Sequence, residues 1–128
     1  METEQYLDSD LCHTIIGAAI DVHKQLGPGL LESVYEACLN YELTARNINF
    51  SRQWSHKLIY KNIKLAERLR VDFLVENRVV LELKAVDNVL PVHEAQLLSY
   101  LKLLNKRVGL LINFNVPVLK NGITRRVI

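Results

Sequence analysis

Two short runs of alternating apolar residues, 70–75 and 79–85, flank a polar stretch at 76–78. Runs rich in Val, Leu and Phe around such a stretch are typical of a β-hairpin. Because side chains alternate along a strand, the apolar sides stay together only if paired residue numbers sum to an even value. A three-residue turn gives such a register. It predicts that Asp72 lies opposite Glu82.

The same register divides the hairpin into two faces. One face is expected to be wholly apolar and to carry Val71, Phe73, Val75, Val79, Leu81 and Leu83. The other face carries Asp72, Glu82 and Lys84, with Arg70 opposite Lys84. Two opposed carboxylates repel each other unless a cation lies between them. A divalent metal is the natural candidate for that cation.

The available ligands indicate which metal to expect. Carboxylate and water oxygens suit Mg²⁺ or Mn²⁺, whereas the chain has no Cys/His cluster of the kind that zinc prefers. Lys84 follows Glu82 by two residues, so it shares its face at a spacing of roughly 7 Å. An ammonium group at that position can orient water or stabilise the charge that develops on a phosphate.

Three motifs along the chain resemble those of a known family. Asp72 followed by Glu82-Leu83-Lys84 resembles the D…(D/E)-x-K signature of the PD-(D/E)XK nuclease superfamily. Residues 29–35, GLLESVY, resemble the GxxExxY motif that names a small bacterial and archaeal group within it. Residues 96–100, QLLSY, resemble the QxxxY helix motif of nuclease domains in bacterial recombination helicase-nucleases. The motifs also follow the superfamily's order, and the resemblance extends from about residue 11 to the C-terminus.

This resemblance implies a metal-dependent nuclease. Asp72, Glu82, the main-chain carbonyl of Leu83 and Glu32 would hold Mg²⁺ or Mn²⁺, with Glu32 binding directly or through water. Lys84 would position or activate the attacking water. Residue types alone leave another explanation for Glu32, because acids are favoured in the first turn of any helix.

The resemblance also assigns supporting residues. Gln96 and Tyr100 are four residues apart on one helix face, where they would support the substrate. Tyr35 shares the side of Glu32 and is expected to pack, with its hydroxyl bonded to the site. His93 is interpreted as a capping or surface residue near a helix start and is left out of the catalytic set.

Composition predicts one soluble domain, residues 1–128, with residues 1–7 loosely held. The chain is 49% hydrophobic and 23% charged, which is typical of globular proteins. There is no charged leader before a long apolar segment and no run long enough to span a bilayer, so a cytoplasmic protein is expected. Cys12 and Cys38 fall within apolar helical patterns and are expected to be free.

Charge is distributed unevenly along the chain. Residues 1–50 carry a net charge of −6, and residues 51–128 carry +8. The second part is a candidate phosphate-facing side, although an ordinary solvated surface explains the charge equally well. Six cations are expected either to line a groove beside Asp72 or to protect an edge strand from aggregation: Arg52, Lys57, Lys61, Lys64, Arg68 and Arg70.

Periodicity predicts the remaining elements. Helices are expected from 8 or 9 to 26, from about 31 to 46, and from 91 to about 104. Further strands are expected over 49–60, 107–114 and 123–128, with a turn at 61–62. The order ααβββαβ indicates an α/β fold with a mixed central β-sheet flanked by helices. It resembles the three-layer restriction-endonuclease-like core.

The leading hypothesis is therefore a Mg²⁺-dependent deoxyribonuclease that hydrolyses phosphodiester bonds in DNA. The alternative is a non-catalytic nucleic-acid-binding or scaffold module that keeps the same fold. So small a domain would reach two DNA strands more easily as a homodimer or with a partner protein. No membrane partner is expected.

Overall fold

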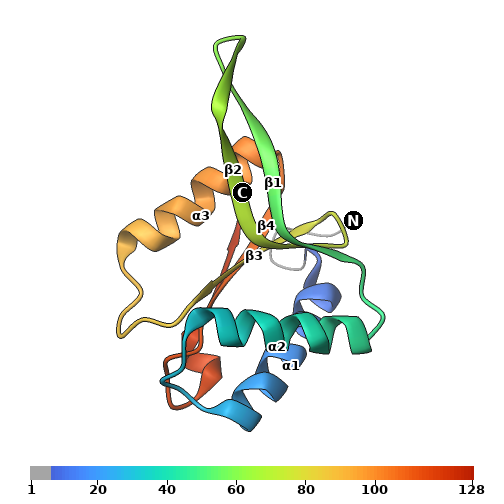
Figure 1. The fold of residues 1–128 in the computed structure, drawn as a ribbon, viewed down its shortest axis with the longest axis vertical. Coiled ribbons are helices and arrows are strands. Elements are labelled where there is room, and N and C mark those ends of the chain that lie inside the picture. The colour runs from blue at the N-terminus through green and yellow to red at the C-terminus, as the bar shows by residue number, and fades with distance from the viewer. Residues whose placement is uncertain (1–6) are drawn as a thin grey trace.

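The computed structural model describes residues 7–128, which form one five-stranded sheet with helices on both faces (Figure 1). The helices are α1 (Ser9–Leu26), α2 (Glu32–Ala45), α3 (Pro91–Leu104) and the short 3₁₀ helix η2 (Leu119–Gly122). The strands are β1 (Phe50–Tyr60), β2 (Ile63–Val75), β3 (Val79–Lys84), β4 (Val108–Asn113) and β5 (Ile123–Val127). Their order across the sheet is β1-β2-β3-β4-β5.

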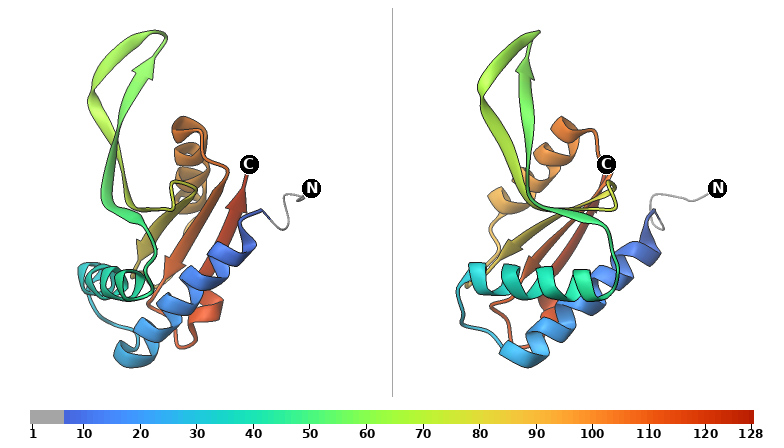
Figure 2. Two further views of the ribbon diagram at one scale, coloured as in Figure 1. Left: turned by 90° about the vertical axis from the view of Figure 1, so that its right-hand side faces the viewer. Right: turned by 45° about the vertical axis from the view of Figure 1, so that its right-hand side comes forward.

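The sheet is mixed, as predicted. β3 and β4 are parallel and joined through α3, while the other neighbouring pairs are antiparallel. Side chains on one face of the sheet form a core with α1 and α2, and those on the other face form a second core with α3. The two views of Figure 2 show these layers, with α1 and α2 on the opposite side of the sheet from α3. The predicted α/β fold with three layers is thus confirmed.

The hairpin register is also as predicted. Phe73 pairs with Leu81 and Val75 with Val79, so paired numbers sum to 154. The turn is closed by Glu76 and Asn77, which both adopt the left-handed conformation, with φ of 52° and 55°. This register brings the Asp72 end of β2 beside the Glu82 end of β3.

One prediction about the hairpin faces is wrong. Val71 was expected beside Phe73, but it packs with Leu69 and Leu74 in the core under α3. The alternation of β2 is interrupted at Asp72, where the pairing with β3 has ended. Opposite this point, Gln53 of β1 has a φ of 52°, so the strand pair bends there.

β2 is also longer than the alternating run suggested. It begins at Ile63, and with β1 it extends well beyond the rest of the sheet (Figure 1). The turn at its end is formed by Lys61 and Asn62, both with positive φ, as the predicted turn requires. We call residues 55–70 the arm.

Three further features bear on the sequence predictions. Cys12 and Cys38 are both free, as expected. Among the residues that the structure describes, no helix has the length and apolar character needed to cross a membrane. The predicted loose segment, residues 1–7, lies outside the described residues except for Leu7.

Candidate active site

The candidate site lies where β2 separates from β3. The last pair of the β2–β3 ladder is Phe73 with Leu81, so β3 loses its main-chain partner beyond that point. The Asp72 carboxylate takes over, because its Oδ2 accepts a hydrogen bond of 2.8 Å from the Leu83 N–H. The carboxylate of Asp72 is therefore held against β3 at the point where β2 separates from it.

Glu82 is a buried carboxyl group beside Asp72. Glu82 is only 8% exposed, and its Oε1 has no hydrogen-bond partner among the described residues. Burial raises the pKa of Glu82 to about 9, and the charge of Asp72 and a hydrogen bond with it act in the same direction. Lys84 opposes this shift in pKa. An unpaired buried oxygen of this kind calls for a proton or a cation.

Strand geometry adds a third oxygen. The N–H and C=O of a strand residue point to the same side. The Leu83 N–H points to Asp72, whereas the Lys84 carbonyl accepts a 2.9 Å hydrogen bond from Phe114 on the other side of β3. The Leu83 carbonyl therefore opens towards Asp72.

This donor set fits Mg²⁺ or Mn²⁺. Two carboxylates and a carbonyl are hard oxygen ligands, and such ions commonly keep several waters as well. Within residues 7–128, no three His, Cys, Asp or Glu side chains gather into a ready-made ligand set. Asp72, Glu82 and the Leu83 carbonyl would therefore supply the direct protein ligands.

Glu32 faces the same cluster from the start of α2. Burial raises its pKa, the charges of Asp72 and Glu36 raise it further, and Lys84 lowers it. The structure thus brings Glu32 into electrostatic contact with the acids and the lysine of the predicted site. With no set of three ligands present, its position suits contact through water.

Glu36, which lies one turn after Glu32 on α2, and Gln53 of β1 also join the site. The Gln53 amide donates hydrogen bonds to Glu36 and, at 3.4 Å, to Asp72. Arg52 donates to Glu36 at 2.9 Å, so an acid of α2 already neutralises this member of the predicted cationic group. The left-handed backbone that turns Gln53 inwards has no signature in the sequence.

α3 brings the two QxxxY side chains to the acids. The pKa of Tyr100 is raised by burial and then by the charges of Glu82 and Asp72, while a hydrogen bond with Gln96 lowers it. The hydroxyl group of Tyr100 therefore stays protonated and can donate. His93 acts as predicted, because its Nδ1 accepts a 3.0 Å hydrogen bond from the Leu90 N–H and caps α3.

Tyr35 packs as predicted, but its hydroxyl group does not bond to the acid cluster. Its ring is buried and stacks on Phe114 at 4.5 Å. The hydroxyl donates to the Gly27 carbonyl at 2.6 Å and accepts from the Leu30 N–H at 3.1 Å. It therefore fixes the loop that leads into α2 and supports Glu32 only indirectly.

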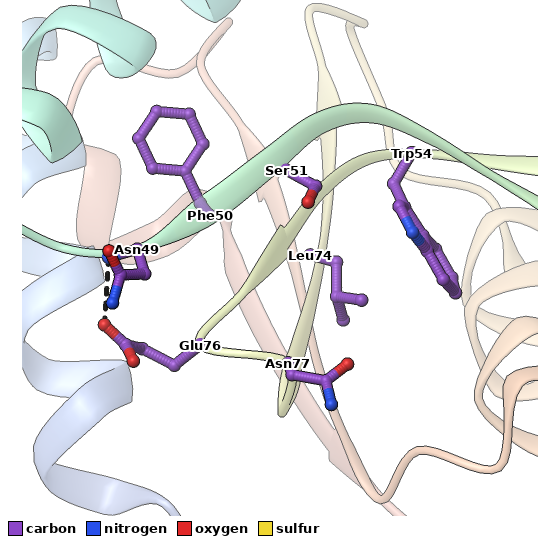
Figure 3. Close-up of a pocket in the computed structure, with 7 residues that line it drawn as sticks. All are labelled: Asn49, Phe50, Ser51, Trp54, Leu74, Glu76 and Asn77. Atoms are coloured by element: carbon purple, nitrogen blue, oxygen red, sulfur yellow. Dashed lines mark hydrogen bonds between the residues drawn. The ribbon is translucent and has the colours of Figure 1, made fainter.

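A separate hollow lies beside the 76–78 turn (Figure 3). Its only carboxylate, Glu76, accepts a 2.9 Å hydrogen bond from the Asn49 N–H. Phe50, Trp54 and Leu74 supply its apolar walls. It contains none of the acids of the candidate site and adds nothing to its chemistry.

Comparison with known proteins gives a match over most of the chain. Residues 9–126 match a family described as the PD-(D/E)XK nuclease superfamily. No curated protein and no solved structure matches the chain. The matched segment includes Glu32, Asp72, Glu82, Lys84 and the α3 helix.

Proposed function

Because the chain belongs to the PD-(D/E)XK nuclease superfamily, we propose that it is a metal-dependent nuclease that hydrolyses phosphodiester bonds in DNA. The observation that carries this proposal is the buried Oε1 of Glu82, which has no partner among the described residues although it lies beside Asp72. Two adjacent buried carboxyl groups cannot both be ionised at neutral pH unless a cation lies between them.

Asp72, Glu82 and the Leu83 carbonyl would hold Mg²⁺ or Mn²⁺, with Glu32 contributing through water. A cation bound there supplies Lewis acidity at the phosphate and lowers the pKa of water. Lys84 orients the attacking water and places a positive charge where negative charge develops on the phosphate.

The α3 side chains serve the substrate. Tyr100, whose hydroxyl stays protonated, donates a hydrogen bond to a phosphate oxygen, and Gln96 orients that hydroxyl. Tyr35 holds the loop before α2, which keeps Glu32 at the site. The GLLESVY segment that contains both residues supports placing the chain in the GxxExxY group of the superfamily.

The test is cleavage of labelled single-stranded, double-stranded and branched DNA with Mg²⁺ or Mn²⁺. We expect the native protein to cleave, and Asp72→Asn and Lys84→Met to lose at least about a hundredfold in rate, as when a charge-stabilising group is removed. Asp10→Asn and Lys24→Met change the same residue types on α1, away from the site, and should cleave like the native protein.

Two results would contradict the proposal. Equal cleavage by the native protein and both site variants would place the activity elsewhere. Metal-independent binding of DNA without cleavage, unchanged by Asp72→Asn, would favour the alternative of a non-catalytic nucleic-acid-binding module with the same fold.

A further inference from the structure

The arm, residues 55–70, extends from the candidate site away from the body of the protein (Figures 1 and 2). Both strands of the arm are largely exposed, and only Leu69 is buried. Its charged residues are five cations and a single acid: Lys57, Lys61, Lys64, Arg68, Arg70 and Glu67. A hairpin of this length with so little burial contributes little to the core, so its sequence needs another explanation.

The arm begins at the candidate site. Arg70 and Arg68 precede Asp72 by two and four residues, which places them about 7 Å and about 13 Å along the strand from it. A hollow lies between these two arginines and Tyr100 of α3. Its lining residues are Ser55, Arg68, Leu69, Arg70 and Tyr100. A chain of phosphates that passes the acids would therefore continue onto these two side chains.

Within the part of the chain that the structure describes, the cations of the arm form no ion pair with an acid. Lys57, Lys64 and Arg70 make no ion pair within residues 7–128. Arg68 is held by Ser55, through hydrogen bonds of 2.7 Å to Oγ and 3.3 Å to the carbonyl, so its charge is oriented but not neutralised.

Outside the arm, by contrast, carboxylates pair with four arginines: Arg46, Arg52, Arg78 and Arg126. The arm thus carries five cations and one acid on largely exposed strands, where its positive charge can attract a polyanion.

The tip of the arm is apolar between cations. Ile59, Tyr60 and Ile63 are each about 60% exposed. Lys61 lies 5.4 Å from the ring of Tyr60. Such a combination fits a nucleic-acid groove, whose floor offers base edges and whose walls are phosphates.

We propose that the arm binds double-stranded DNA on one side of the scissile bond, with Arg70 and Arg68 on the phosphates nearest the site. This inference rests on the proposed nuclease function. The two-stranded ribbon has the shape that a major groove admits. At about 3.4 Å per base pair, Arg68 reaches about four base pairs from Asp72 and the tip reaches about nine.

The test measures binding of a labelled 20-base-pair duplex by anisotropy in EDTA, so that cleavage plays no part. The double variant Arg68→Gln/Arg70→Gln should lose more than roughly tenfold in affinity, because each arginine gives up a charge-assisted hydrogen bond. The slope of log K against log salt should fall by about 2. Lys24→Gln/Lys120→Gln removes the same charge outside the arm and should change neither quantity.

The outcomes separate this proposal from the nuclease function. If duplex binding depends on the arm but no metal gives cleavage, the proposal for the arm is supported and the proposed nuclease function is contradicted. If the Arg68/Arg70 variant cleaves and binds duplex as well as its control does, the proposal for the arm is overturned. The proposed nuclease function is then unaffected. An equal loss of affinity for a 20-nucleotide single strand would overturn the commitment to a duplex.

The tip has its own test. Ile59→Ser/Ile63→Ser should weaken duplex binding and leave the sedimentation of the free protein unchanged. If this variant instead converts a dimer into a monomer while duplex affinity is kept, a second copy of the chain is the partner of the tip, and the proposal for the tip is overturned.

Discussion

Glu82→Gln tests how the buried carboxyl is accommodated when no metal is bound. In the folded protein the pKa of Glu82 is raised to about 9, whereas its ordinary value is 4.5. The folded state therefore binds a proton that the unfolded state has lost between these two values. The resulting stabilisation is complete below about pH 4.5, declines as the pH rises, and is gone above about pH 9.

The magnitude follows from one proton per molecule. Within that window the free energy of unfolding falls by about 1.36 kcal/mol per pH unit. The native protein in EDTA should therefore lose about 2.7 kcal/mol from this group between pH 6 and pH 8. Glu82→Gln cannot ionise and should lack that loss, so the difference between the two proteins isolates the group.

The assay is urea unfolding at pH 6 and pH 8 in EDTA. Glu67→Gln, a substitution of the same type on the exposed arm, should follow the native protein. If native protein and Glu82→Gln lose the same stability between the two pH values, Glu82 is already ionised at pH 6 and the reasoning from its burial is refuted. With Mg²⁺ present, the native protein should be stabilised more at pH 8 than at pH 6, because the ion must displace the proton.

Two further substitutions test the supports of the site. Tyr35→Phe keeps the ring stack but removes the hydroxyl from Gly27 and Leu30, and it should cost about 1–3 kcal/mol in urea unfolding. Asn113→Ala removes a buried amide that bonds to both main-chain groups of Val86, at 3.1 Å and 2.9 Å, and it should cost about 2–4 kcal/mol by the same measurement. A loss below about 0.5 kcal/mol in either case would contradict these assignments.

Most of the fold could be predicted because its signals are local. Apolar spacing placed the helices, and the even register of the hairpin followed from a short turn between two alternating runs. That register was enough to set Asp72 beside Glu82, and in the structure the Leu83 N–H donates a hydrogen bond to Asp72 at this point.

What the sequence could not predict depends on where strands separate. Alternation is the same in a paired and an unpaired stretch, so it did not reveal that β2 leaves β3 at Asp72 or that Val71 changes face. Gln53 turns inwards through a left-handed backbone conformation, which is uncommon for residues other than glycine and therefore not expected at a glutamine. The ion pair of Arg52 joins β1 to Glu36 of α2, and apolar periodicity within one element does not predict contacts between two elements.

The central claim is that Asp72 and Glu82 form a metal site, and Mn²⁺ binding followed by electron paramagnetic resonance tests it most directly. The account predicts one bound ion per chain in the native protein and in Asp10→Asn, with binding lost or weakened at least about tenfold in Asp72→Asn and in Glu82→Gln. Binding that is unchanged in both site variants, or absent from the native protein at millimolar Mn²⁺, would contradict the claim.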